Sequence, residues 1–360
     1  MSMKLLIITQ KVDKNDLILG FFHGWLIEFA KNIEKLTIIC LGIGEHNLPQ
    51  NVSVFSLGKP TQGWPVSDWK RLFYKLRALV IFYKYIFKLR KEYDAVFVHM
   101  NKEYMILGGL LWKLWNKKVA LWYNHPFGDI AAKISVFLSN NVFYTSPQAF
   151  TSRYKKSKQM SAGIDTNLFR KIEDIKKDKN SILFLGRISP IKNLDLLINA
   201  IISINKSGGN LKLNIYGGPI NSADYSYIDN LKTNTKKYDK FIIFNEPIAN
   251  NKTPEIFNKH ELFVNLTPSG SLDKTTLEAM SCGSLVLVSN EYFDEILDND
   301  LKKIVLFKEK DLDDLIIKIK QIFKLNKNKK KEISEKLREI VIQKHGLSLL
   351  VKNVIETLSK

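Results

Sequence analysis

Short apolar runs of strand length alternate with helix-periodic segments along the chain, and this alternation occurs in two successive sets. Such alternation predicts parallel sheets with helices on their faces, and 360 residues suffice for two domains of this kind. We therefore predict an α/β fold with two similar doubly wound halves. The expected strands are residues 4–9, 36–41, 52–57, 95–99, 119–123 and 142–145 in the first set, and 181–185, 211–216, 241–244, 262–266, 285–289 and 304–307 in the second.

A charged, apolar-poor stretch, K-I-E-D-I-K-K-D-K-N at residues 171–180, is the expected linker. It would separate an N-terminal domain of residues 1–170 from a C-terminal domain of residues 181–344. Three helices are expected toward the end of the chain, at residues 311–322, 332–345 and 347–358, with a solvated basic break at 326–331.

The chain is strongly basic, with a formal net charge of +19. This charge predicts an anionic partner, which can be a nucleic acid, a membrane surface or a phosphorylated small molecule. The basic residues are spread along the sequence and no nucleic-acid-binding motif occurs, so we expect no nucleic acid partner. Cys40 and Cys282 are the only cysteines, which excludes a disulfide framework and a cysteine-based metal site.

No signal peptide is visible, and the longest uncharged apolar stretch, at residues 104–112, is too short to span a bilayer. We expect a cytoplasmic protein that is at most peripheral at the inner face of the cell membrane. Residues 69–91 read as a basic amphipathic helix that can lie on an anionic membrane; a core helix with a solvated basic face is the alternative. Its expected apolar stripe is Leu72, Leu76, Leu79, Val80, Tyr83 and Phe87.

The clearest candidate site begins where the strand at residues 181–185 ends in a glycine, Gly186. Arg187 and Lys192 follow on the turn, and the helix-periodic segment begins at Leu194. Two cations beside a helix N-terminus are suited to a diphosphate. A βα loop with two solvated cations is the alternative.

A second candidate loop follows the strand at residues 262–266. Ser269, Gly270 and Ser271 form a cradle of small residues before a helix that ends at Gly283, and such a cradle suits an anion or sugar hydroxyls. Glu278 lies in that helix among apolar neighbours. Ribose hydroxyls can donate to such a carboxylate, and a salt bridge to a local lysine is the alternative.

Three residues of the first half lie near expected strand ends. Gly20 follows the first strand and its loop, where a glycine either lets backbone N–H groups approach a ligand or only serves the turn. His99 and His125 lie at or beyond two further strand ends, where open α/β sheets bind ligands; a structural role for both is the alternative.

Several motifs resemble those of family 4 glycosyltransferases, in the order of that family. They are L-F-L-G-R-I-S-P-I-K-N-L-D-L-L-I-N-A at 183–200, preceded by G-I-D-T-N-L-F at 163–169 and followed by I-Y-G-G-P at 215–219 and L-E-A-M-S-C-G at 277–283; W-Y-N-H at 122–125 is a looser match. The resemblance implies a GT-B fold, in which two Rossmann-like doubly wound parallel-sheet domains face a cleft. It also implies a helix at residues 345–360 that crosses back to the N-terminal, acceptor-side domain.

The resemblance further implies a retaining enzyme that moves a sugar from a nucleotide-diphosphate sugar, linked to UDP or GDP, to an acceptor hydroxyl. Arg187 and Lys192 would neutralise the diphosphate, Glu278 would bind the ribose, Gly20 would offer its N–H to the distal phosphate, and His125 would lie near the transferred sugar. The implied catalytic residues are thus Arg187, Lys192 and His125, and the implied donor-binding residues are Gly20, Gly186, Ser269, Gly270, Ser271, Asp273, Lys274 and Glu278.

One position departs from the family pattern. The family commonly has a second glutamate eight positions before Glu278, where this chain has Gly270. The loop resembles a subgroup with a G-x-x-D-K sequence, which makes Asp273 and Lys274 candidates for sugar or phosphate contacts. A solvated pair in the first turn of the helix is the alternative reading of these two residues.

No D-x-D dyad lies at the end of an expected strand, which agrees with a metal-independent reaction that needs no cofactor besides the donor. The expected acceptor is a glycan or a lipid-linked acceptor in cell-surface glycan or glycolipid synthesis. Two other functions stay open at this point. One is a catalytically degenerate GT-B scaffold that binds ligands, and the other is a nucleotide-sugar epimerase.

Overall fold

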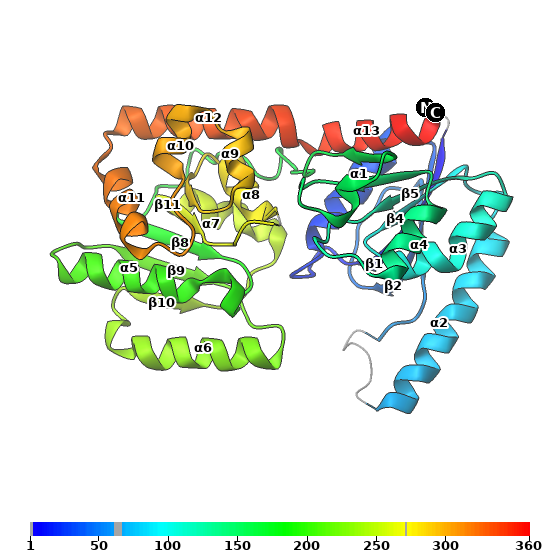
Figure 1. The fold of residues 1–360 in the computed structure, drawn as a ribbon, viewed down its shortest axis with the longest axis horizontal. Helices are drawn as coiled ribbons and strands as arrows, with labels where there is room; N and C mark the ends of the chain where they lie inside the picture. Colours follow the sequence, from blue (N-terminus) through cyan, green and yellow to red (C-terminus); the bar gives the residue numbers. More distant parts are fainter. Residues whose placement is uncertain (1–2, 61–66, 271) are drawn as a thin grey trace. The chain divides into compact units, whose positions relative to one another are not determined.

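The computed structural model describes residues 3–60, 67–270 and 272–360. The chain divides into two compact units, Met1–Gly163 with Leu347–Lys360 and Ile164–Gly346. Each unit is built on a parallel sheet with helices on both faces (Figure 1), so the predicted α/β class with two parallel sheets is confirmed.

The first unit contains, in its described residues, a seven-stranded sheet with the order β3-β2-β1-β4-β5-β6-β7. All its strands pair in parallel. The strands are β1 (Lys4–Val12), β2 (Lys35–Ile43), β3 (Val52–Ser56), β4 (Ala95–His99), β5 (Lys118–Trp122), β6 (Asn141–Tyr144) and β7 (Ser157–Gln159).

Alternate residues of β1 point to two separate cores, which is why this strand is a nearly continuous apolar run. Leu5 and Ile7 pack under α1 (Gly20–Asn32) and α13 (Leu347–Ser359), whereas Leu6 and Ile8 pack under the opposite helical layer. That second layer comprises α2 (Asp68–Lys88), α3 (Lys102–Leu114) and α4 (Ile130–Leu138).

The second unit contains a five-stranded parallel sheet with the order β10-β9-β8-β11-β12. Its strands are β8 (Ser181–Leu185), β9 (Lys212–Tyr216), β10 (Ile242–Asn245), β11 (Leu262–Asn265) and β12 (Leu285–Val288). Its helices are α5 (Leu194–Lys206), α6 (Ser222–Thr235), α7 (Thr253–Lys259), α8 (Lys274–Ser281), α9 (Tyr292–Ile296), α10 (Asn299–Val305), α11 (Leu312–Lys324) and α12 (Lys327–His345). The strand order reverses at β8 and β11, so the loops that follow these two strands lie at the switch point of the sheet.

The division between the units differs from the predicted boundary at residues 170/171. Residues 164–180 belong to the second unit and are not a separate linker. Ile172 N donates to Asn258 Oδ1 of α7 at 2.9 Å. Ser281 Oγ of α8 donates to the backbone carbonyl of Phe169 at 2.6 Å. Charged side chains dominate this stretch, but its backbone and its few apolar side chains hold it against α7 and α8.

Three smaller expectations are corrected. Residues 304–307, predicted as a strand, are the end of α10 and a single bridge between Val288 and Leu306. Residues 326–331, predicted as a break, form the first turn of α12, because Asn326 caps the helix by accepting a hydrogen bond from Lys329 N. The short strand β7 was not predicted, because its three residues S-K-Q carry no apolar signal.

Helix α2 uses a different apolar face from the one predicted. Ala78, Phe82 and Ile86 are its buried residues. Of the predicted stripe, Leu72, Leu76, Val80 and Phe87 are exposed and Leu79 and Tyr83 are half-buried. Within the described residues, no helix is both long and apolar enough to cross a membrane.

Candidate functional site

The turn after β8 holds Arg187 by two contacts from its own unit. Its Nε donates to Ser189 Oγ at 3.3 Å and lies 3.8 Å from the buried Asp224 Oδ2 of α6. The Arg187 side chain is still 41% exposed, so the guanidinium is oriented by the protein and open to solvent. A held cation with exposed donors is what binding of an oxyanion requires.

Gly186 and Gly217 bring the turns after β8 and β9 into backbone contact. Their φ angles are +151° and +149°, a region that favours glycine. A Cβ on Gly217 would lie 1.8 Å from the Gly186 carbonyl oxygen, so no side chain fits there. A Cβ on Gly186 would meet no atom within 4 Å, so the space beside Gly186 is open. This arrangement fixes the start of the turn that carries Arg187.

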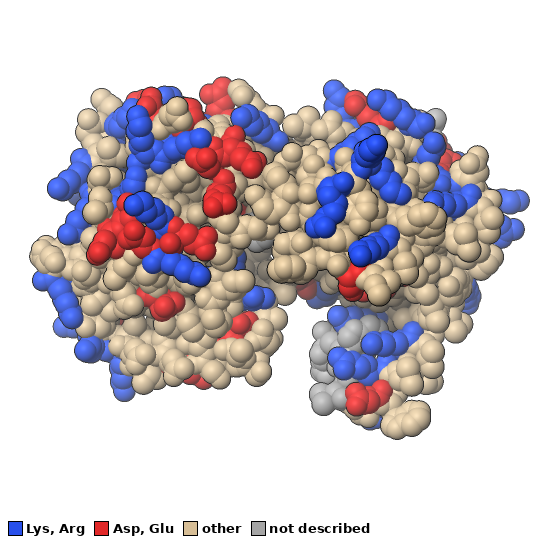
Figure 2. Space-filling model, in the orientation of Figure 1, with Lys and Arg blue, Asp and Glu red and all other residues tan. Residues whose placement is uncertain are grey.

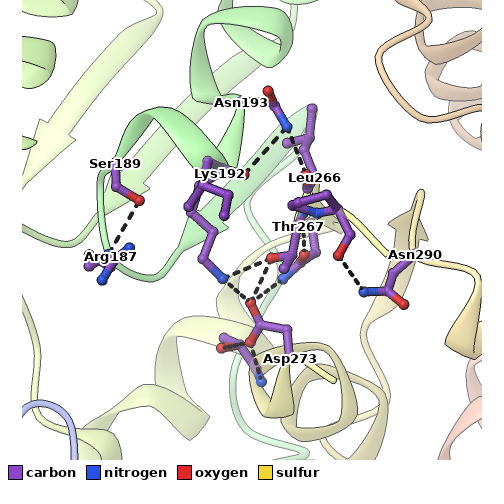
Figure 3. Close-up of polar contacts among 12 residues, drawn as sticks. Arg187, Ser189, Lys192, Asn193, Leu266, Thr267, Asp273 and Asn290 are labelled. Carbon is purple, nitrogen blue, oxygen red and sulfur yellow. Dashed lines mark hydrogen bonds and ion pairs between the residues drawn. The ribbon is translucent and has the colours of Figure 1, made fainter. Parts of the chain in front are cut away.

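Lys192 is the last residue of the 3-10 turn η2 (Pro190–Lys192) and points to the neighbouring loop after β11 (Figure 3). Its Nζ donates to Asp273 Oδ2 at 2.5 Å and to Thr267 Oγ1 at 2.8 Å. The adjacent Asn193, with a left-handed φ of +47°, donates from Nδ2 to the Leu266 carbonyl at 3.2 Å. These contacts tie the two switch-point loops together.

Asp273 accepts five hydrogen bonds from protein donors. Oδ2 accepts from Lys192, Thr267 and Asn265, and Oδ1 accepts from the N–H and the hydroxyl of Thr275 at the start of α8. Burial alone would raise the pKa of Asp273, but the Lys192 charge and these donors hold it well below its usual range. Asp273, predicted as a contact for sugar or phosphate or as a solvated helix-turn residue, therefore positions Lys192 and caps α8.

The loop before α8 is held from the other side. Ser269 N donates to Glu309 Oε2 at 3.1 Å, and Ser269 Oγ accepts from Glu291 N at 3.0 Å. Gly270 has a φ of +106° and open space where a Cβ would lie. Ser271, the third residue of the predicted cradle, lies outside the described residues.

Glu278 and Lys274 lie one turn apart on α8. Glu278 is 5% exposed, and its Oε1 accepts a hydrogen bond from Asn250 Nδ2 at 3.0 Å. Burial raises the pKa of Glu278 and lowers that of Lys274, and the attraction between the two charges opposes both shifts. A carboxylate has about four acceptor positions, so Glu278 can accept from ligand hydroxyls besides Asn250.

The three candidate residues of the first unit differ in what they offer. Gly20 begins α1, and its N–H donates to the Asp16 carbonyl at 3.0 Å, so this N–H is not offered to a phosphate in this structure. His125 is exposed, and its Nδ1 is engaged by its own loop, 3.1 Å from both the N and the O of Phe127. His99 is buried and stacks on Phe22 with ring centroids 4.0 Å apart, which is a core role.

The comparisons with known proteins bear on the unit that carries Arg187 and Lys192. Residues 165–340 match the family model of Glycosyl transferases group 1. The matched residues include the turn after β8, the loop before α8 and α8 itself. Over 174 residues the chain is 28% identical to YtcC of Bacillus subtilis, a protein whose name proposes a glycosyltransferase; the match covers 44% of this chain and 42% of YtcC.

Two solved structures share the whole fold. HepE of Anabaena, solved in complex with UDP, has 16% sequence identity and a TM-score of 0.75, with 99% of this chain and 100% of HepE covered. Sucrose-phosphate synthase from Thermosynechococcus elongatus has 13% identity and a TM-score of 0.74, with 98% of each chain covered. The chain therefore has the GT-B fold of two parallel-sheet units.

Sequence reasoning missed Asp224 and Thr267, which contact the two cations, and Asn265, which donates to Asp273. Asp224 lies far from Arg187 in sequence, and its N-S-A-D context reads only as a helix start, where Asn221 caps α6. Thr267 and Asn265 read as a strand end followed by a small polar loop. The one available signal was the position of both loops after strands at the centre of a parallel sheet.

Proposed function

We propose that the chain is a retaining glycosyltransferase that moves a sugar from a nucleotide-diphosphate sugar to an acceptor hydroxyl. The observation that carries this proposal is the pair of held cations, Arg187 and Lys192, on one turn at the switch point of the second sheet. The group 1 match supports sugar transfer, and the UDP bound to HepE supports a UDP-linked donor before a GDP-linked one.

The proposed chemistry breaks the bond between the anomeric carbon and the terminal phosphate oxygen of the donor. The bonding electrons pass to that oxygen, so negative charge grows on the diphosphate in the transition state, where fixed cations stabilise it. The acceptor oxygen bonds to the anomeric carbon on the same face, and its proton goes to the departing phosphate. Arg187 and Lys192 supply the charge, and the proposal assigns no step to a metal ion.

Other residues have supporting roles in this proposal. Glu278 accepts hydrogen bonds from the ribose hydroxyls, and its spare acceptor capacity supports this role. The open faces of Gly186 and Gly270 allow close approach of the donor to the backbone. His125 acts near the transferred sugar, where its exposed ring offers Nε2.

The test is turnover with a panel of UDP- and GDP-sugars, first as donor hydrolysis and then with glycan and lipid-linked acceptors. Arg187→Ala and Lys192→Ala are each expected to lower kcat/KM by about 100-fold or more, as loss of an electrostatic stabiliser does. Arg170→Ala and Lys206→Ala, which remove exposed cations elsewhere on the same unit, serve as matched controls. Activity should persist in the presence of a chelator such as EDTA.

Near-normal turnover in both site variants would refute the proposed role of the cations. Calorimetry with UDP and a product assay without acceptor separate the remaining outcomes. Binding of UDP without transfer to any acceptor would support a degenerate scaffold, for which Gly270 in place of the family's glutamate is the relevant feature. Interconversion of donor sugars without an acceptor would support an epimerase.

A further inference from the structure

Helix α2 carries two apolar stripes, and only one of them faces the core of the first unit. The inward stripe is Ala78, Phe82 and Ile86. The outward stripe repeats every three to four residues, which places its members on one face of the helix, roughly opposite Phe82. It consists of Trp69, Phe73, Leu76, Val80 and Phe87, with exposed fractions of 83%, 63%, 53%, 68% and 45%.

A basic row runs beside the outward stripe. Lys70, Arg77, Lys84 and Lys88 recur at helical spacing and lie next to the apolar face, and Asp68 is the one acid of the helix. The α2 end that lies away from the sheet extends beyond the body of the first unit (Figure 1), and its visible surface shows Lys and Arg beside uncharged residues (Figure 2). Solvent is a poor environment for five large apolar side chains in a row, so this face has the composition of a contact surface.

We propose that α2 docks on an anionic lipid bilayer, with the outward stripe in the headgroup boundary and the basic row on the lipid phosphates. Trp at the start of the stripe suits this boundary because its ring is apolar and its N–H is polar. The charge pattern decides against a second copy of the chain as the occupant. Two α2 helices packed through their outward stripes would bring the basic rows together with too few acids to neutralise them.

This proposal does not depend on glycosyltransferase activity. The binding should require both parts of the surface, because apolar burial gives the contact its depth and Lys and Arg give it preference for anionic lipid. Binding should also weaken as salt screens the lipid charge.

The experiment is flotation of the full chain with vesicles of phosphatidylcholine, with and without about 30% phosphatidylglycerol, a fraction that gives a clearly negative surface. We expect binding to the anionic vesicles at low salt and little binding to neutral ones. Phe73→Glu with Val80→Glu should lower the vesicle-bound to free ratio by about tenfold or more. The control pair is Ile317→Glu with Ile342→Glu, which changes exposed apolar residues on α11 and α12.

A second variant separates charge from apolar contact. The triple change to Glu at Lys70, Arg77 and Lys84 should abolish the preference for phosphatidylglycerol. The control is the triple change to Glu at the exposed residues Lys206, Lys236 and Lys320, which should leave most of that preference. Circular dichroism checks that every variant is folded. The proposal is overturned if the wild-type chain does not float with anionic vesicles, or if control and α2 variants lose binding equally. It is also overturned if sedimentation shows a dimer that the Phe73→Glu, Val80→Glu variant dissociates.

Discussion

Replacing Asp273 by Asn isolates the charge that holds Lys192, because the two side chains have nearly the same size and shape. The carboxylate accepts three hydrogen bonds at Oδ2 and two at Oδ1. The amide nitrogen of Asn cannot accept, so either orientation of the amide leaves two or three donors without an acceptor. Lys192 also loses its counter-charge in a site where little water reaches it.

The expected loss of stability follows from the burial of the Lys192–Asp273 ion pair. Removing one partner of a fully buried ion pair costs about 3–5 kcal/mol. The side chains of Lys192 and Asp273 keep exposed fractions of 20% and 14%, so the expected loss lies at or below the lower limit of this range. We expect Asp273→Asn to lower the free energy of unfolding by about 2–3 kcal/mol.

Asp311→Asn is the matched control. Asp311 caps α11 by accepting from Asp314 N, as Asp273 caps α8, but no lysine pairs with it among the described residues. Since Asn caps helices about as well as Asp does, this change should cost less than about 0.5 kcal/mol. The difference between the two variants therefore measures the Lys192 network and not the cap.

Urea unfolding followed by far-UV circular dichroism gives the comparison. All six tryptophans precede residue 123, so tryptophan fluorescence reports on the first unit and serves as an internal reference. The pH dependence has a definite sign. Because the folded pKa of Asp273 is lowered, its contribution is complete above its usual value of 3.8 and is lost as the pH falls from there toward the folded pKa.

The gap between the wild type and Asp273→Asn should accordingly close in acid. Equal midpoints for Asp273→Asn and Asp311→Asn at neutral pH would refute the reasoning, as would a gap that widens below pH 4, the region below the usual Asp pKa.

Three further changes test other parts of the site. Gly217→Ala should lower the free energy of unfolding by about 2–4 kcal/mol, because its Cβ would collide with the Gly186 carbonyl. Gly208→Ala is the control: its φ is +89° but the space is open, so it should lower this free energy by about 1 kcal/mol. Equal urea midpoints of the two variants would contradict this. Burial raises the pKa of Glu278, so its ionisation opposes folding as the pH rises above the usual 4.5. Glu278→Gln should therefore be at least as stable as the wild type at pH 8. The affinity for UDP, measured by calorimetry, should fall by about tenfold. A loss of stability at pH 8 would show that the charge is needed for folding. His125→Ala removes an exposed ring and should lower kcat by about 10- to 100-fold in the transfer assay with an unchanged melting temperature; unaltered kcat would remove His125 from the proposed mechanism.

The sequence by itself determined the class of fold and the location of the principal turns. Strands such as β1 and β8 are buried on both faces, so a continuous apolar run identifies them without knowledge of their neighbours. Gly283 ends α8 with a φ of +72°, a conformation that local chemistry favours for glycine. Both are short-range properties, and they could be read correctly from residues adjacent in the chain.

The boundaries between elements needed the structure wherever local signals conflicted. Residues 304–307 are apolar enough for a strand, but only Leu306 reaches β12, through one bridge, and the preceding turns belong to α10. Lysines at 327–331 suggested a break, but Asn326 caps the helix, and Lys330 packs back onto Phe323 and Glu261. Residues 171–180 looked like a linker, but the hydrogen bond from Ile172 N to Asn258 of α7 holds them in the second unit.

The roles within the candidate site also depended on tertiary structure. From the sequence, Arg187 and Lys192 were cations on a turn, and Asp273 was a candidate ligand contact. Only the parallel arrangement of β8 and β11 brings Lys192, Thr267 and Asp273 into one network, and only α6 brings Asp224 to Arg187. The sequence specifies which charges are present, whereas the pairing of buried charges is decided by side chains that are far apart in the chain and meet only in the folded unit.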